Sequence, residues 1–257
     1  MGLIDWTGSC AVVTGAASGL GGATAERLAQ AGLKIGLFDL NAELGQAQAE
    51  RIGGTFHQVD VADPASVTSG LDAVEAAHGP VRIMVNCAGI VDGAKTVSRG
   101  VPHDPHVFQK VIAVNLIGTF NCASQAAARM VATDGTGSDG ARGVIVNTAS
   151  VAAYEGQVGQ VAYSASKAGV AGLTLPMARD LADKGVRVCA IAPGLFLTPM
   201  LQSLPDEVQA SLGAQVPFPS RLGAPEEFAE MVFHIASNPM LNGEVIRLDG
   251  AIRMSPR

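Results

Sequence analysis

The chain has 257 residues, of which 48% are hydrophobic and 16% charged, and its mean hydropathy is +0.29. This composition excludes a disordered chain and provides the core of one large domain. The low charged fraction means either that much of the surface is apolar or that further copies of the chain cover it, and we expect an oligomer. The net charge of −6 argues against nucleic acid as the main ligand, because a phosphate backbone attracts basic proteins.

Apolar runs of strand length alternate with amphipathic stretches of helix length, which is the pattern of repeated βαβ units. The predicted strands are residues 10–14, 34–39, 55–60, 81–86, 143–148, 186–192 and 244–248. The predicted helices are residues 21–31, 42–52, 64–78, 105–132, 162–183 and 225–237. We therefore expect an α/β fold, a single domain over residues 1–257 with a doubly wound, seven-stranded parallel sheet and helices on both faces.

A glycine-rich turn lies between the first predicted strand and the first predicted helix. Residues 14–21 read Thr-Gly-Ala-Ala-Ser-Gly-Leu-Gly, which is typical of a turn that binds a pyrophosphate with the N–H groups of a helix start. Asp39, at the end of the second strand, is placed to accept bonds from the adenosine ribose and to repel a 2′-phosphate. The pattern favours NAD(H) over NADP(H), and a helix N-cap is the alternative role for Asp39.

Two further segments end predicted strands and should border the cofactor, because ligands bind outside the carboxyl ends of strands in open α/β sheets. Asp60 and Val61 suit the adenine amino group and ring edge. The segment Asn86-Cys87-Ala88-Gly89 follows the fourth strand. For Asn86, a structural role in tying neighbouring strands together is an equal alternative.

Four polar residues form a candidate centre for proton transfer. Tyr163 and Lys167 lie four residues apart in a predicted helix and share a face, so the ammonium could lower the phenol pKa from about 10 toward neutrality. Ser150 follows the fifth strand and could hold a substrate oxygen beside Tyr163. Asn115 must be hydrogen-bonded inside an apolar helix, either to the local backbone or to a water that relays protons from Lys167.

Two segments interrupt the alternation of strands and helices. Residues 133–142 are rich in Gly, Asp, Ser and Thr and predict a surface loop. Residues 196–221 are too apolar for a bare loop and too interrupted by prolines for one long helix, so we expect a helical lid over a pocket. The alternative for this segment is a helix packed on the core.

The remaining features bear on metals, membranes and compartment. The four cysteines form no Cys-x-x-Cys pair, and His103 and His106 have no clustered ligands, so we expect reduced thiols and no metal. The uncharged run 111–128 contains several amides and predicts a buried or interfacial helix, with no membrane partner. Residues 1–10 show no targeting pattern, which favours a cytoplasmic location, or the mitochondrial matrix in a eukaryote.

Together these motifs resemble the short-chain dehydrogenase/reductase family over nearly the whole chain. The resemblance is carried by Thr14-Gly-x-x-x-Gly-x-Gly21, Asn86-x-Ala-Gly89, Asn115, Ser150, Tyr163-x-x-x-Lys167 and Pro193-Gly194. It implies a Rossmann sheet, NAD as the cofactor, the catalytic tetrad Asn115, Ser150, Tyr163 and Lys167, and a homotetramer. Cys87 and Ala251 depart from the family pattern, which more often has Asn and Gly there, but neither belongs to the tetrad.

Longer segments resemble a branch of this family that oxidises 3-hydroxyacyl-CoA and is also described for hydroxysteroids. They are residues 86–90, 147–153, 155–160, 192–196, 215–223 and 242–254, and residues 91–105 match an insertion of the branch. The resemblance implies NAD-linked oxidation of a 3-hydroxyacyl-CoA to the 3-oxoacyl-CoA, a step of β-oxidation. A steroid or branched secondary alcohol is the alternative substrate, and a non-catalytic dinucleotide-binding scaffold is the third interpretation.

The same resemblance implies which residues contact the cofactor and which contact the substrate. The residues that it places around the cofactor are Gly15, Ser18, Gly19, Leu20, Gly21, Asp39, Asp60, Val61, Asn86, Cys87, Ala88, Gly89, Tyr163, Lys167, Pro193, Gly194, Phe196 and Thr198. Phe196 and the apolar lid would cover the nicotinamide and the acyl chain. Gln157 or Gln160 is a candidate to bond the thioester carbonyl beside Ser150 and Tyr163, with stabilisation of the loop as the alternative.

Overall fold

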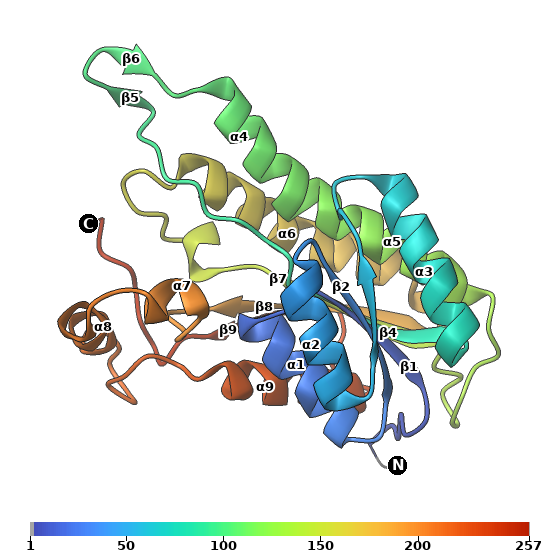
Figure 1. The fold of residues 1–257 in the computed structure, drawn as a ribbon. Coiled ribbons are helices and arrows are strands. Elements are labelled where there is room, and N and C mark those ends of the chain that lie inside the picture. The colour runs from blue at the N-terminus through green and yellow to red at the C-terminus, as the bar shows by residue number, and fades with distance from the viewer. Residues whose placement is uncertain (1–2, 257) are drawn as a thin grey trace.

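The computed structural model describes residues 3–256, which form one seven-stranded, wholly parallel sheet in the order β3-β2-β1-β4-β7-β8-β9 (Figure 1). Its strands are β1 Cys10–Thr14, β2 Lys34–Asp39, β3 Thr55–Gln58, β4 Val81–Asn86, β7 Gly143–Thr148, β8 Val186–Pro193 and β9 Val245–Leu248. The chain builds outward from β1 to β3 and then returns to β4 on the other side of β1. The carboxyl ends of β1 and β4 are therefore the switch point where such sheets bind ligands.

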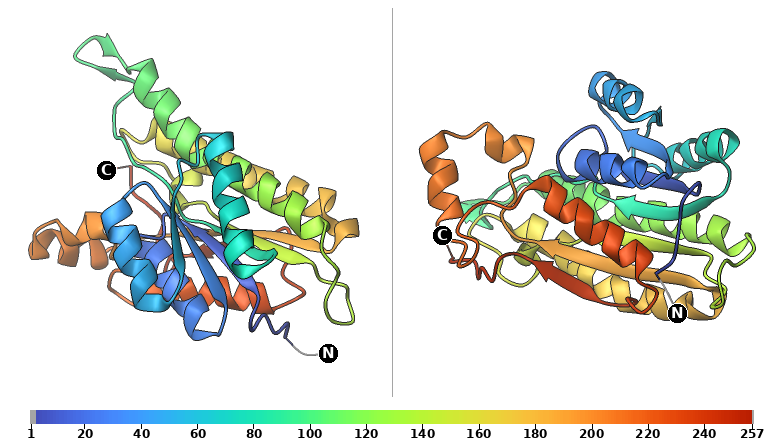
Figure 2. Two further views of the ribbon diagram at one scale, coloured as in Figure 1. Left: turned by 45° about the vertical axis from the view of Figure 1, so that its right-hand side comes forward. Right: turned by 90° about the horizontal axis from the view of Figure 1, so that it is seen from below.

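Helices cover both faces of the sheet, as the two views in Figure 2 show. The longer helices are α1 Gly19–Gln30, α2 Ala42–Ile52, α3 Pro64–His78, α5 Thr119–Val131, α6 Val161–Asp180 and α9 Pro225–Ser237; the shorter ones are α4 Pro105–Ile112, α7 Pro199–Gln202 and α8 Asp206–Gly213. One apolar core joins the sheet to α1, α2 and α9, and a second joins it to α3, α5 and the end of α6. The expected doubly wound α/β fold is confirmed.

The strand sequences reflect their place in the sheet. Every residue of β1, β7 and β8 is buried, whereas β3 and β9 at the two edges are only partly buried. Central parallel strands are covered on both faces and therefore read as continuous apolar runs rather than as an alternation. This is why the strands could be located from apolar runs alone.

Several segments differ from the expected elements, and α6, for example, ends at Asp180, three residues before the expected end. β3 ends at Gln58, two residues before the expected end at Asp60, because the following residues turn toward α3. The expected helix 105–132 is divided by a π-helical segment, Ala113–Gly118, between α4 and α5. Residues 91–105 contain a short hairpin, β5 Val97–Ser98 and β6 Val101–Pro102, that projects from the body of the molecule (Figure 1).

The helical stretch Pro105–Val131 is, by length and composition alone, apolar enough to cross a membrane. Its second half packs against the sheet, where Cys122, Ala126 and Met130 are completely buried. The apolar composition of this half is thus accounted for by contact with the protein core, in line with the buried helix expected there.

Candidate active site

The side chains of Ser150 and Tyr163 meet at the carboxyl edge of the sheet. Ser150 follows β7 and begins the 3-10 turn Val151–Ala153, where its Oγ accepts a hydrogen bond from the Ala152 N–H at 3.1 Å. The hydroxyl of Ser150 also lies near the phenol of Tyr163, in the first turn of α6, close enough to lower the pKa of the phenol. A hydroxyl and a phenol placed side by side can together hold and deprotonate a substrate alcohol.

Lys167 lies one helical turn beyond Tyr163, but its ammonium is directed to the end of β7. Nζ donates to the Thr148 carbonyl at 2.7 Å and lies 5.8 Å from the centroid of the Tyr163 ring. Burial raises the pKa of Tyr163, and the nearby Ser150 hydroxyl offsets this only in part. The expected lowering of the phenol pKa by Lys167 is therefore not found in the chain alone, because burial is the largest effect on Tyr163 and the ammonium bonds Thr148 instead.

Burial acts on Lys167 as well, and lowers the pKa of this group from 10.5 to about 8. The side chain is 4% exposed, and a nearby thiol, Cys87, partly offsets the effect of burial. A buried ammonium whose pKa lies this close to neutrality can exchange protons with groups placed beside it. This property suits a relay between the phenol and solvent.

Asn115 lies in the π segment and holds the backbone of the loop after β4. Its Oδ1 accepts from the Ile90 N–H at 2.8 Å, and its Nδ2 donates to the Ile90 carbonyl at 2.9 Å. The Asn115 carbonyl accepts the hydroxyl of Thr119 at 2.7 Å. Of the two roles expected for Asn115, bonding to the local backbone is the one that the described contacts contain.

The glycine turn after β1 brings backbone atoms so close together that a side chain would not fit there. A Cβ on Gly21 would lie 2.2 Å from the Gly15 oxygen, and Gly15 has a φ of +64° that favours glycine. Helix α1 begins at Gly19 after Ser18, whose side chain makes no capping bond. The first N–H groups of α1 therefore remain available for an anion, as a pyrophosphate requires.

Asp39 joins the end of β2 to the glycine turn. One carboxylate oxygen accepts the Ala17 N–H and the other the Asn41 N–H, both at 3.0 Å. Asn41, not Asp39, caps α2 by accepting the Leu44 N–H at 3.0 Å, so the N-cap alternative for Asp39 is wrong. Each Asp39 oxygen keeps acceptor capacity for the hydroxyls of a ribose.

The remaining strand ends line the same edge. Asp60 binds the backbone N–H of Ala62 at 2.9 Å, and Val61 is buried against the π segment at Gly118. Asn86 donates to Asn147 Oδ1 at 2.8 Å and is 3% exposed. The structural role considered for Asn86 is thus present, since its amide ties β4 to β7, and its contact with the cofactor stays a prediction.

The loop after β4 completes this edge at Cys87, Ala88 and Gly89. The hydroxyl of Thr148 donates to Cys87 Sγ at 3.6 Å, and burial raises the pKa of this thiol to about 11. A Cβ on Gly89 would lie 3.3 Å from Asn115 Oδ1 and 3.6 Å from Lys167 Nζ. Glycine here brings the backbone close to the candidate catalytic groups.

The segment 196–221 leaves the sheet through a short neck beyond Pro193 and Gly194. Leu197 N–H donates to the Gly223 carbonyl, and Gly223 N–H donates to the Leu195 carbonyl, both at 2.8 Å. The segment contains α7 and α8, and a Cβ on Gly19 would lie 3.3 Å from the ring of Pro199, which directly follows Thr198. The start of the predicted lid thus lies across the glycine turn.

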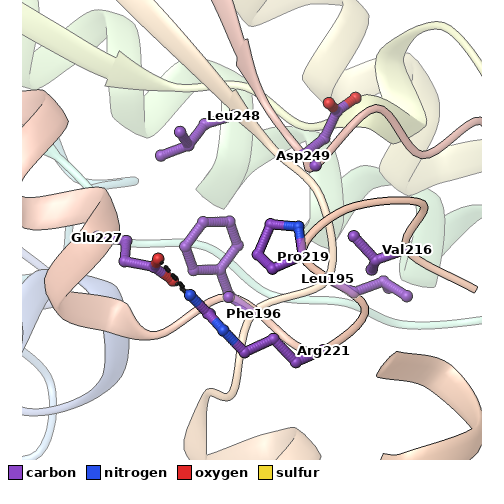
Figure 3. A pocket seen from close by; sticks show the side chains of 10 residues that line it. Leu195, Phe196, Val216, Pro219, Arg221, Glu227, Leu248 and Asp249 are labelled. Carbon is purple, nitrogen blue, oxygen red and sulfur yellow. Dashed lines mark hydrogen bonds and ion pairs between the residues drawn. The ribbon is translucent and has the colours of Figure 1, made fainter. Parts of the chain in front are cut away.

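The ring of Phe196 packs into the interior beside the neck, and its expected contact with the cofactor stays a prediction. The ring is 7% exposed and packs edge-on against Phe228 of α9, with 6.4 Å between ring centroids. It borders a cavity of about 110 Å³ behind the neck, closed on one side by the ion pair of Arg221 and Glu227 (Figure 3). Phe196 anchors the neck because an apolar ring gains more from the core than from an open edge.

Gln157 and Gln160 lie on the loop between Ser150 and Tyr163. Gln160 Oε1 accepts the Gln157 N–H at 3.0 Å, and Gln157 Nε2 donates to the Ser255 carbonyl at 3.1 Å. Both amides line a cavity of about 600 Å³ that residues 94–97 close from the other side. These contacts match the loop-stabilising alternative, and they occupy one polar atom of each amide.

Among residues 3–256, no group of three or more His, Cys, Asp or Glu side chains is arranged to hold a metal ion. One residue of the site carried no signal in the sequence. Ser166 bonds both Asn115 and the Tyr163 backbone, yet a serine in a helix that contains several small residues is unremarkable by composition.

The model of the family described as short chain dehydrogenase matches residues 9–209. The chain belongs to this family, the short-chain dehydrogenases/reductases, as its motifs predicted. It is 54% identical to the human 3-hydroxyacyl-CoA dehydrogenase type-2 over 253 residues, 97% of each chain. The Drosophila melanogaster protein of the same name is 51% identical, over 95% of this chain and 97% of that one. A crystal structure of 3-hydroxyacyl-CoA dehydrogenase type-2 from Mycobacterium avium has a TM-score of 0.92 at 43% identity and covers 97% of this chain and 98% of its own.

Proposed function

We propose that the chain oxidises a 3-hydroxyacyl-CoA to the 3-oxoacyl-CoA with NAD. The observation that carries the proposal is the contact of Ser150 with Tyr163 at the sheet edge that also holds the glycine turn and Asp39. The similarity to 3-hydroxyacyl-CoA dehydrogenases over almost the whole chain supports the substrate class. A pure dinucleotide-binding scaffold has no need for these two hydroxyls beside a buried lysine.

The residues present fit a nicotinamide dinucleotide. The glycine turn and the first N–H groups of α1 would hold the pyrophosphate, and Asp39 would accept the adenosine ribose hydroxyls. Asp39 supports NAD over NADP, because its carboxylate would lie close to a 2′-phosphate. When bound, the nicotinamide accepts the hydride that leaves C3 of the substrate.

The chain supplies proton transfer and orientation. Ser150 would donate a hydrogen bond to the 3-hydroxyl oxygen, and Tyr163 would take the hydroxyl proton as the C3–H bond breaks. Lys167 would hold the nicotinamide ribose and pass the proton on, since its lowered pKa permits exchange. Asn115 would keep the loop after β4 in place through Ile90.

Replacing the general base tests this assignment. Tyr163→Phe keeps the ring and removes only the phenol oxygen, so kcat for 3-hydroxybutyryl-CoA oxidation should fall by about a hundredfold or more. Binding of NAD, followed by calorimetry, should persist. Activity of the variant within about tenfold of wild type would show that another group removes the proton.

A substrate panel tests the chemical class. Short, branched and long 3-hydroxyacyl-CoAs, hydroxysteroids and branched secondary alcohols should be compared by kcat/KM with NAD. The proposal expects the highest kcat/KM with a 3-hydroxyacyl-CoA. Preference for a steroid or a simple alcohol would replace this substrate class while keeping the catalytic residues.

We also propose that the chain acts as a homotetramer in the cytoplasm, or in the mitochondrial matrix of a eukaryote, without a nucleic-acid or membrane partner. Exposed apolar side chains on the π segment, α5 and α6 support the inference that further copies of the chain pack against these helices. Ile117 is 48%, Phe120 51% and Leu175 44% exposed. The four free cysteines suit a reducing compartment.

A further inference from the structure

The hydroxyl of Ser166 connects two of the candidate catalytic residues. Its oxygen accepts a hydrogen bond from Asn115 Nδ2 at 3.1 Å and donates one to the Tyr163 carbonyl at 2.7 Å. Ser166 is completely buried in α6, so water does not compete for these bonds. One small side chain thus links the π segment to the first turn of α6.

Ile90 fixes the direction of these hydrogen bonds. Its N–H can only donate and its carbonyl can only accept, and they bond Asn115 Oδ1 at 2.8 Å and Nδ2 at 2.9 Å. The amide therefore cannot be turned over, and its nitrogen has one hydrogen left for Ser166. Ser166 must accept there, and its own proton goes to the Tyr163 carbonyl.

We propose that Ser166 is a positioning residue that sets the phenol of Tyr163 relative to the loop after β4. Without the hydroxyl, α6 and the Asn115–Ile90 pair keep their own hydrogen bonds. They lose the Ser166 bond that fixes the position of α6 relative to Asn115. The proton-accepting oxygen and the cofactor-bordering backbone near Gly89 then vary in relative position. This inference rests on the proposed function, because the position of the phenol matters only if it exchanges a proton with substrate.

Removing the hydroxyl leaves one N–H of Asn115 without a partner, but both groups that bond Ser166 keep another hydrogen bond, so the fold should stay intact. Asn115 Nδ2 keeps its bond to the Ile90 carbonyl. The Tyr163 carbonyl lies within α6 and keeps the intrahelical partner four residues further on. A rate effect in Ser166→Ala would therefore report on geometry rather than on unfolding.

The test compares Ser166→Ala with Ser164→Ala. Ser164 lies on the same helical turn, and its buried hydroxyl oxygen has no hydrogen-bond partner, so it is a matched control. In Ser166→Ala, kcat should fall by about tenfold while KM and the Kd for NAD stay unchanged, because misplacement acts on the reacting geometry. The pH at which kcat reaches half its maximum should also rise, since a displaced phenolate is less well stabilised. Ser164→Ala should match wild type in both.

A conservative variant separates positioning from stability. Ser166→Thr restores the hydroxyl, and threonines elsewhere in this chain, such as Thr119 and Thr174, already bond helix carbonyls in this way. We expect Ser166→Thr to recover kcat and the pH profile. Ser166→Cys, with a weak donor of similar size, gives the same comparison if Ser166→Ala does not fold.

Two results would overturn the proposal. One is equal kcat and pH dependence in Ser166→Ala and Ser164→Ala. The other is a loss in Ser166→Ala that follows its melting temperature and is not recovered by Ser166→Thr. If wild type fails on every 3-hydroxyacyl-CoA, the proposed substrate is wrong, and the variants are compared on the alcohol that wild type does oxidise, which keeps the two failures distinguishable.

Discussion

The ammonium of Lys167 donates a 2.7 Å hydrogen bond to the carbonyl of Thr148, the last residue of β7. A positive charge is thereby held at the end of a completely buried strand, and burial lowers the pKa of Lys167 from 10.5 to about 8. The bond to Thr148 stabilises the charged form, so it limits the cost of keeping the ammonium inside the protein.

This relationship predicts how stability depends on pH. Between about pH 8 and 10.5 the unfolded chain binds the Lys167 proton more tightly than the folded chain, so stability should rise with pH across that window. The gain is at most on the order of 3 kcal/mol, and less if the Thr148 bond is strong. Denaturant unfolding of Lys167→Met should lack this rise, whereas the exposed Lys110→Met should keep it. Equal slopes in the two variants would contradict the buried charge.

Asp39 predicts cofactor choice through two separable contributions. Asp39→Ala removes both the charge and the acceptor of the Ala17 N–H, so the Kd for NAD should rise by about tenfold or more. Asp39→Asn keeps an acceptor and removes only the charge, so it should improve NADP binding relative to NAD with a smaller loss for NAD. Calorimetric titration with both dinucleotides measures these ratios. An unchanged NADP to NAD ratio in both variants would remove Asp39 from the ribose site.

Arg187 in β8 closes the carboxyl end of α9 and predicts a large stability effect. Its guanidinium donates to the carbonyls of Ile235 at 2.8 Å, Ala236 at 2.6 Å and Leu241 at 2.7 Å, and the side chain is 8% exposed. Arg187→Met leaves these carbonyls with fewer donors, so the free energy of unfolding should fall by about 3 kcal/mol. The exposed Arg179→Met should change it by less than about 0.5 kcal/mol. A similarly small change in both variants would mean that the Arg187 hydrogen bonds to these carbonyls add little to the free energy of unfolding.

The exposed apolar side chain of Phe120 predicts an assembly contact. If α5 and α6 pair between subunits, Phe120→Asp buries a charge at the interface and should dissociate the tetramer. Size-exclusion chromatography with light scattering should give about four times 26.1 kDa for wild type and a smaller mass for the variant. Leu44→Asp, 50% exposed on α2, is the control and should remain tetrameric. A monomeric wild type would refute the assembly.

The sheet could be located from the sequence because its central strands are covered on both faces. An apolar run such as Val144 to Val146 is typical of a strand that is buried on both faces of a parallel sheet. The spacing between such runs leaves room for the helices that connect parallel strands. The glycine turn was equally informative, because few arrangements bring backbone as close to backbone as Gly21 to Gly15. These features are local, so a single sequence reveals them.

Features that depend on distant contacts could not be predicted. The π segment lies between α4, which packs on α6, and α5, which packs on the sheet, and no local pattern in residues 113–118 indicates this division. The packing of Phe196 on Phe228 could not be predicted, because the two residues are remote in sequence. The raised pKa of Tyr163 is due mainly to burial, and the spacing of residues along a helix does not indicate how deeply a side chain is buried.

The π segment has a consequence for how this chain can tolerate changes in length. A π turn holds one more residue than an α turn, so deleting a single residue from Ala113–Gly118 would convert it to an α turn. The deletion would shift Asn115 relative to the backbone of Ile90, to which its side chain is hydrogen-bonded. The hairpin can grow or shrink by whole segments without such an effect, because it lies outside the helix. We therefore expect changes in length to be better tolerated at the tip of this arm than at its base.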